Sequence, residues 1–174
     1  MRCALFLAFA LAATSCASAT SSSSGTRPAG DDAARFETLK SLSGNWVSTG
    51  QAGSPPGAKV SYRVTAAGSA VEETVFAGTP HEMVTLYTLD QGRMVMTHYC
   101  AIGNQPHMEL QPGTAPNVYL FVCTSLGNGD PAKDMHMHSG EMTLVDPGHL
   151  KTAWTLWDEG KPGDVHGFDL KRAQ

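Results

Sequence analysis

Apolar and polar residues alternate along most of the chain with a period of two, the pattern of β-strands with one buried face. Val60, Tyr62 and Val64, for example, fall on one face of a short segment. Glycine, proline and asparagine interrupt the alternation about every eight to twelve residues, which is typical of short strands joined by tight turns. The predicted strands are 45–50, 60–64, 71–76, 82–90, 93–102, 107–111, 117–125, 140–146, 150–158 and 164–172.

Only residues 31–42 have convincing helical spacing, with apolar residues at every third position. This segment opens with two aspartates, which favour a helix start, and Gly44 ends it. No helical crossover separates the strands, so the connections fit an up-and-down antiparallel meander. A sheet of about ten strands must close or fold over to protect its edges. We therefore predict an all-β protein: one antiparallel β-barrel with a short N-terminal helix.

The first thirty residues do not follow the strand pattern. Arg2 precedes an apolar run at 4–13, which is shorter than the roughly 20 residues that span a bilayer and is typical of a secretory signal peptide. Ordinary cleavage after Ala19 would make residues 1–19 the signal peptide. The stretch before Cys16 also resembles a lipobox, which would make 1–15 a lipoprotein signal and Cys16 the lipidated residue.

Both processing alternatives predict export, to the periplasm, to a membrane or cell surface as a lipoprotein, or into the medium. Residues 20–30 are serine-rich and are expected to form a disordered tether. The folded domain is then 31–174, long enough to bury a core without disulfides.

Composition and motifs narrow the function classes. Hydrophobic residues make up 41% of the chain, which argues against disorder of the domain. The net charge of −4 provides no basic field, so we do not expect a nucleic-acid partner. The sequence has neither a Gly-x-Ser-x-Gly motif nor a phosphate-binding glycine loop, and we do not expect an enzyme. The oligomeric state is left open by these patterns.

The segment Gly44-Asn45-Trp46 follows the predicted helix at the head of the first strand. It resembles the opening of lipocalin and calycin barrels, in which the tryptophan packs across one end. Further stretches, including SYRVTAAGSAVEETVFAGTP and LVDPGHLKTAWTLWDEGKPGDVHGFDLKR, extend the resemblance over 36–172 to a bacterial family of secreted lipocalin-like domains of unknown function. This resemblance implies a lipocalin-like barrel more firmly than it implies a function.

The expected shape is also similar to that of nitrobindins, ten-stranded barrels that hold haem through a histidine of the last strand. In this chain His166 shares a face of the last predicted strand with Phe168 and Leu170. The resemblance therefore implies haem as one candidate cofactor. A solvated His166 at the barrel mouth is the alternative.

A lipocalin-like barrel is expected to bind a small apolar or amphipathic ligand in its interior. The alternatives are a metal or haem protein and a structural envelope protein with a filled barrel. The long connection 126–138 is predicted to lie over one end, beside the ligand entrance. The candidate ligand contacts are Trp46, Tyr62, His98, His107, Phe121, His138, Trp154 and His166.

Histidine and methionine occur in local groups, such as Met135-His136-Met137-His138. Imidazole with thioether or thiolate is a ligand set that suits copper, above all Cu(I). The candidate metal ligands are His98, His107, His136 and His138, which two strand ends and one loop could bring to a single rim. The alternative is that the methionines fill the core and the histidines are solvated.

Two cysteines, Cys100 and Cys123, belong to the predicted domain. An oxidising compartment favours a disulfide between them. The predicted strand 107–111 lies between them, however, and residues two strands apart are about 10 Å apart, beyond the roughly 4.4–6.8 Å of a disulfide. A disulfide, two buried thiols and a reactive or metal-bound cysteine therefore remain as alternatives.

Overall fold

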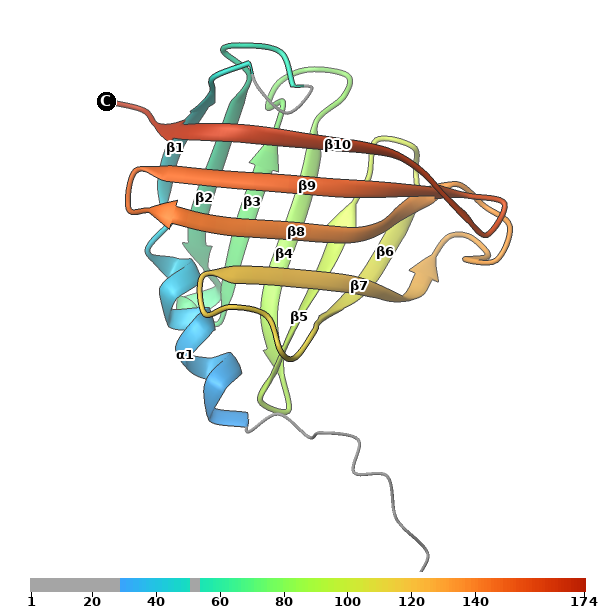
Figure 1. Cartoon of the computed structure of the whole chain (residues 1–174), viewed down its shortest axis with the longest axis horizontal. Coiled ribbons are helices and arrows are strands. Elements are labelled where there is room, and N and C mark those ends of the chain that lie inside the picture. Colours follow the sequence, from blue (N-terminus) through green and yellow to red (C-terminus); the bar gives the residue numbers. More distant parts are fainter. Residues whose placement is uncertain (1–28, 51–53) are drawn as a thin grey trace, which may run out of the picture.

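A computed structural model describes residues 29–50 and 54–174 (Figure 1). The helix α1 (Ala29–Lys40) precedes ten strands, and a short 3-10 turn, η1 (Ala66–Gly68), follows the second of them. The strands are β1 (Gly44–Ser48), β2 (Lys59–Thr65), β3 (Ala70–Val75), β4 (Met83–Asp90), β5 (Arg93–Tyr99), β6 (Gln105–Leu110), β7 (Val118–Gly127), β8 (His136–Asp146), β9 (His149–Asp158) and β10 (Lys161–Arg172).

Every strand pairs antiparallel with its neighbours in the chain, and β1 pairs with β10 to close the barrel. The closing register places Trp46 opposite Arg172 and Ser48 opposite Leu170. Closure satisfies the backbone groups that an open sheet would expose at its edges. The predicted fold class, a single closed up-and-down barrel with one short helix, is confirmed.

Most boundaries differ from the prediction by one to four residues, and two of these differences change the description of the chain. The helix begins at Ala29, so it includes the last two residues of the predicted tether, and the acidic pair Asp31 and Asp32 lies in its first turn. The strand β8 begins at His136, so the connection from β7 is shorter than the predicted 126–138. The turn residues of this connection end before Met135, and His136, Met137 and His138 are paired in β8 across a bulge.

The predicted signal peptide, the lipidation site Cys16 and the tether up to residue 28 lie outside the described residues. Within 29–50 and 54–174, no helix is both long and apolar enough to cross a membrane.

The barrel has two different ends. The helix α1 covers one of them, at the lower left of Figure 1, and we call this the helix end. The connections β1–β2, β3–β4, β5–β6, β7–β8 and β9–β10 lie at the other, which we call the cavity end. At the helix end, Phe36 and Leu39 of α1 are buried against the fully buried Trp46. Burial of apolar side chains here closes one end of the barrel.

Polar contacts fix the helix to the barrel. The buried carboxylate of Asp32 accepts a hydrogen bond from the backbone N–H of Met94 at 2.8 Å. One turn further along α1, the guanidinium of Arg35 donates to the carbonyl oxygens of Ala115 and Val118 at 3.0 and 2.9 Å. These contacts join α1 to β5, to the β6–β7 connection and to the first residue of β7, so the helix is packed as part of the barrel domain.

Arg172 joins the last strand to the helix end. Its guanidinium lies over the Trp46 ring at 4.4 Å and donates to the carbonyl oxygens of Ser41 and Ser43 at 3.0 and 2.8 Å. The Trp46 indole N–H donates in turn to the Leu42 carbonyl at 2.8 Å. One arginine thus satisfies carbonyl groups where the chain passes from α1 to β1.

We expect Arg172→Ala to lower the free energy of unfolding by about 2 kcal/mol, because it removes charge-assisted hydrogen bonds and a cation–π contact. The control is Arg63→Ala, which removes an ion pair with Glu72 from a side chain that is 63% exposed. That change is expected to cost less than about 1 kcal/mol. Urea unfolding of the three proteins measures the difference, and equal effects of the two substitutions would contradict this role of Arg172.

Candidate functional site

A cavity of about 300 Å³ lies inside the cavity end of the barrel. Most of its walls are apolar, and the polar side chains in them are a serine and two histidines. The lining residues are Ser54, Pro55, Val75, Phe76, Met83, His98, Met137, Trp154, His166, Gly167 and Phe168. They come from six strands and from the β1–β2 and β3–β4 connections, so the closed sheet itself positions the cavity.

Two glycines determine how closely the cavity walls approach one another. A Cβ at Gly167 would collide with the backbone carbonyl of Thr152, so only glycine lets β10 pass β9 this closely. A Cβ at Gly140 would lie 3.0 Å from the Trp154 ring. The absence of a side chain at Gly140 therefore makes room for the indole that forms one wall.

His98 is the buried polar group of the cavity wall. It is 3% exposed, its ring lies 4.7 Å from that of Trp154, and its Nδ1 lies 2.9 Å from Thr85 Oγ1. Burial lowers the pKa of His98 from 6.5 to about 4, because desolvation disfavours the imidazolium. The ring is therefore neutral near pH 7.

Behind His98, polar side chains form a row across four strands. The sheet register pairs Tyr62 with Glu73, Glu73 with Thr85, and Thr85 with His98. The Tyr62 hydroxyl donates to Glu73 Oε1 at 2.8 Å, and the Tyr87 hydroxyl donates to Oε2 at 2.7 Å. The Thr85 hydroxyl hydrogen-bonds to His98 and is also close enough to Glu73 to favour the ionised carboxylate. We call these five residues the polar row.

The protonation state of Glu73 sets the direction of hydrogen bonding along the row. Burial raises the pKa of Glu73, while the hydroxyls of Tyr87, Tyr62 and Thr85 oppose that rise by donating to the carboxylate. When Glu73 is ionised, Thr85 donates its single proton to Glu73 and must accept from His98 Nδ1–H. The Nε2 atom of His98 then carries the lone pair. Protonation of Glu73 would allow the reverse direction.

The hydroxyls of Tyr62 and Tyr87 remain hydrogen-bond donors near neutral pH. Burial and the neighbouring Glu73 raise the pKa of Tyr62 and of Tyr87 well above 10. Both hydroxyls therefore stay protonated near neutral pH and stabilise the carboxylate.

Three of the eight predicted ligand contacts, His98, Trp154 and His166, line this cavity. His166 is exposed at the mouth, and the buried His98 lies farther inside. The other five predicted contacts lie elsewhere: Trp46 at the helix end, Tyr62 in the polar row, Phe121 in the packed core, His107 exposed beside Thr97, and His138 beside His136.

The four predicted metal ligands do not meet at one rim. His98 faces the cavity, and the exposed His107 has its Nδ1 3.0 Å from Thr97 Oγ1. His136 and His138 do lie together, with Nε2 of the first 3.2 Å from Nδ1 of the second. The ligand atoms of these two histidines and of Cys123 lie within 4.8 Å of one another.

Cys100 and Cys123 are free thiols. Cys100 directly follows β5, Cys123 lies on β7, and β6 separates these strands, as the sequence predicts. Burial raises the pKa of both thiols.

Glu73 and Thr85 were missed as site residues. Glu73 shares the inward face of β3 with Val71 and Val75, whereas Glu72 points outward and pairs with Arg63 at 2.7 Å. A carboxylate at an inward position of an apolar strand is the signal that could have identified it. Thr85 has no comparable signal, because threonine is common on either face of a strand.

No protein-family model matches the chain, and no curated protein matches it. The closed ten-stranded barrel is consistent with a lipocalin-like fold. Membership of the secreted lipocalin-like family and likeness to nitrobindins remain predictions from the sequence.

The neutral His98 predicts a specific loss of stability in acid. As the pH falls through 6.5 the unfolded chain takes up a proton at this residue, whereas the folded protein does so only near pH 4. His98 should therefore lower the free energy of unfolding by about 3 kcal/mol between these two pH values. Urea unfolding from pH 7 to pH 4 should show a shallower decline in His98→Asn, which keeps an N–H for Thr85 but does not titrate.

The control for this experiment is His107→Asn, which removes an exposed histidine with the same type of threonine contact. If the wild-type and His98→Asn proteins lose stability in parallel, His98 is not a buried neutral group.

Proposed function

We propose that this protein binds a small apolar or amphipathic molecule in the cavity at the cavity end of the barrel. The observation that supports this most is the coexistence of mostly apolar walls with one buried neutral histidine, His98. Binding sites for small molecules combine these features, because apolar walls supply affinity and a few polar groups fix orientation. The volume, about 300 Å³, is at the lower end of the usual range for such sites.

The polar row favours a ligand with a hydroxyl head group. With Glu73 ionised, His98 Nε2 is a hydrogen-bond acceptor, so it can receive a proton donor such as an alcohol. A carboxylate offers no donor and would have to lose its hydration beside a neutral ring. We therefore infer that the ligand is uncharged at its polar end and that its apolar part contacts Phe76, Phe168 and Trp154.

Haem fits this cavity poorly. His166 lines it on β10, where the nitrobindin resemblance implies a ligand to the iron, but a cavity of about 300 Å³ is too small to enclose a porphyrin. A filled structural barrel is also disfavoured, because packing is tight at the helix end and the apolar cavity occupies the other. Action outside the cytoplasm, with or without a lipid anchor at Cys16, remains part of the proposal.

Calorimetric titration with 1-octanol and with octanoate at pH 7.5 tests the proposal. We expect 1-octanol to bind at least about tenfold more tightly, because the carboxylate loses hydration without gaining a donor. Met83→Trp, which places an indole into the cavity, should abolish binding. The control is Ile102→Trp, a substitution at a residue of the β5–β6 connection that is 48% exposed and lies outside the cavity lining.

Two outcomes would contradict the proposal. One is the absence of saturable 1-octanol binding to the wild-type protein. The other is equal binding by wild type and Met83→Trp, which would place the ligand elsewhere on the surface.

A further inference from the structure

A second group of ligand-forming side chains lies outside the cavity lining, where β7 and β8 approach their connection. Cys123 lies on β7, and His136 and His138 lie on β8. Their ligand atoms are within 4.8 Å of one another, His136 is completely buried, and the other two are half-buried. A thiol and two imidazoles so close together in a partly dry setting suit a transition-metal ion.

The hydrogen bonds of His136 leave the lone pair on Nε2, the nitrogen that faces His138 and can coordinate a metal. Its Nδ1 lies 2.8 Å from the carbonyl oxygen of Asp134, which can only accept, so Nδ1 carries the proton. The Nε2 atom then has a lone pair and, in the metal-free protein, accepts from His138 Nδ1–H at 3.2 Å. Histidines that bind metals commonly donate their other N–H to a carbonyl oxygen in this way.

The second histidine is held by stacking. The His138 ring lies 3.7 Å from the Trp157 ring, with an angle of 13° between their planes. This contact restricts rotation of the imidazole on its partly exposed side. The site is therefore largely preorganised before any ion arrives.

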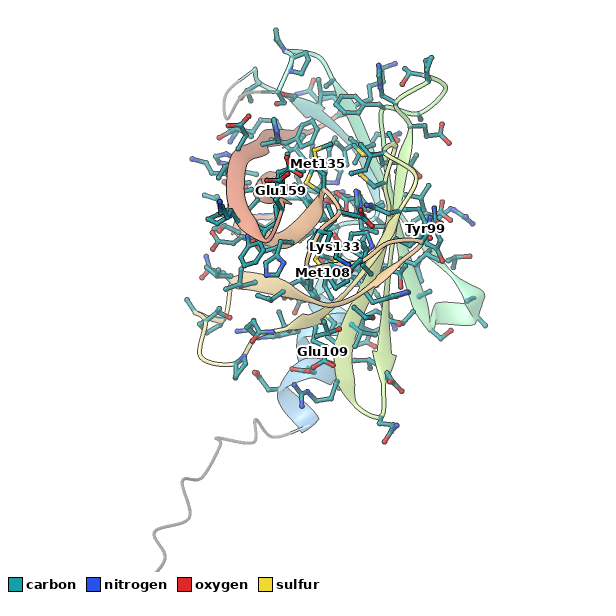
Figure 2. The ribbon with its side chains drawn as sticks, turned by 90° about the vertical axis from the view of Figure 1, so that its right-hand side faces the viewer. Tyr99, Met108, Glu109, Lys133, Met135 and Glu159 are labelled. Atoms are coloured by element: carbon teal, nitrogen blue, oxygen red, sulfur yellow. The ribbon has the colours of Figure 1, made fainter. Side chains whose placement is uncertain are left out.

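The β7–β8 connection supports the cluster from the other side. Figure 2 looks onto this part of the molecule, where Lys133 and Met135 lie beside the β9–β10 turn at Glu159. The Asp134 carboxylate accepts from the Asp130 N–H at 2.7 Å, and Asn104 Nδ2 donates to the Met135 carbonyl at 2.8 Å. These two hydrogen bonds hold the side chain of Asp134 and the backbone of Met135, and so fix the Asp134 carbonyl that accepts from His136.

We propose that Cys123, His136 and His138 bind one d10 metal ion, Zn²⁺ or Cu⁺. With metal–nitrogen bonds of about 2.0 Å and metal–sulfur bonds of about 2.3 Å, tetrahedral coordination places the ligand atoms about 3.3–3.6 Å apart. The two histidine nitrogens, 3.2 Å apart, already fit, and the thiol, within 4.8 Å of them, must approach by at most about 1.5 Å. Three protein ligands suit trigonal Cu⁺, or Zn²⁺ with water in the fourth position.

Binding does not change the oxidation state of the ion. The Cys123 thiol releases its proton to solvent and coordinates as a thiolate. At His138 the proton on Nδ1 is exchanged through solvent for one on Nε2, so this ring remains neutral. One proton is therefore released for each ion bound.

Metal titrations of the purified full-length protein test the site, with Zn²⁺ and Cu⁺ in separate arms and a competing chelator in each. We expect one ion per chain in at least one arm, and a thiolate charge-transfer band when Co²⁺ replaces Zn²⁺. Cys123→Ser should remove that band, and both Cys123→Ser and His136→Gln should weaken binding at least about tenfold. The control, Cys100→Ser with His107→Gln, removes the same residue types outside the cluster and should leave affinity unchanged.

Thermal unfolding followed by circular dichroism distinguishes loss of the site from loss of the fold. The ion should raise the melting temperature of the wild-type protein and not that of Cys123→Ser. If His136→Gln does not fold, the half-buried Cys123 decides the question. The proposal is overturned if neither ion binds at micromolar concentration, or if Cys123→Ser binds as the wild type does.

The proposals for the metal site and for the cavity can be tested independently of each other. Cys123 and His138 do not line the cavity, so Cys123→Ser should bind 1-octanol as the wild type does. Loss of metal binding together with normal octanol binding would confirm that the two sites are separate.

Discussion

A carboxylate buried inside a β-barrel requires hydrogen-bond donors, and in this protein three hydroxyl groups surround Glu73. Burial of an unpaired carboxylate would cost far more than a domain of this size can offset. The hydroxyls of Tyr62, Tyr87 and Thr85 meet this requirement from β2 and β4, the strands on either side of β3. The same contacts limit the positions that these side chains can occupy, so the interior around Glu73 has one arrangement rather than several.

The effect of this constraint reaches the cavity through Thr85. With Glu73 ionised, a Thr85 hydroxyl that donates to it can only accept from His98, which selects the tautomer with the proton on Nδ1. Burial against Trp154 then keeps the ring neutral. In the proposed function, the hydrogen-bonding group offered to a ligand would therefore depend on a carboxylate two strands away that does not itself line the cavity.

The two ends of the closed sheet differ: one is packed and the other contains the cavity. At the helix end, Trp46, Arg172 and α1 fill and seal the barrel. Among the described residues no helix covers the cavity end, and the strands there surround an apolar space next to the polar row. In the proposed function, stability and binding therefore belong to opposite ends of the barrel, and ligand entry would not require the packed end to move.

Much of the fold could be predicted from the sequence, because period-two alternation and turn residues act locally. They predicted ten strands in the observed order and the closure of the barrel. The site was harder to predict, because it depends on register between strands. A bulge between Met137 and Ser139 and the early start of β8 bring His136 and His138 towards Cys123, and no local pattern encodes this.

The same limit applies to the polar row. The inward face of β3 could be read from the alternation of Val71, Glu73 and Val75. That Thr85 and His98 lie at the same level of the barrel follows only from the pairing of β3 with β4 and of β4 with β5. Parity assigns a residue to a face of its strand, whereas register determines which residues of different strands meet.

The tautomer of His98 tests most directly whether Glu73 controls the cavity wall. Long-range nitrogen–proton correlation spectra of the imidazole at pH 7.5 distinguish its two neutral forms. We expect a proton on Nδ1 and a lone pair on Nε2 in the wild-type protein, with loss of this preference in Thr85→Val. A proton on Nε2 in the wild type, or an imidazolium at this pH, would contradict the proposed control of the cavity by the buried carboxylate.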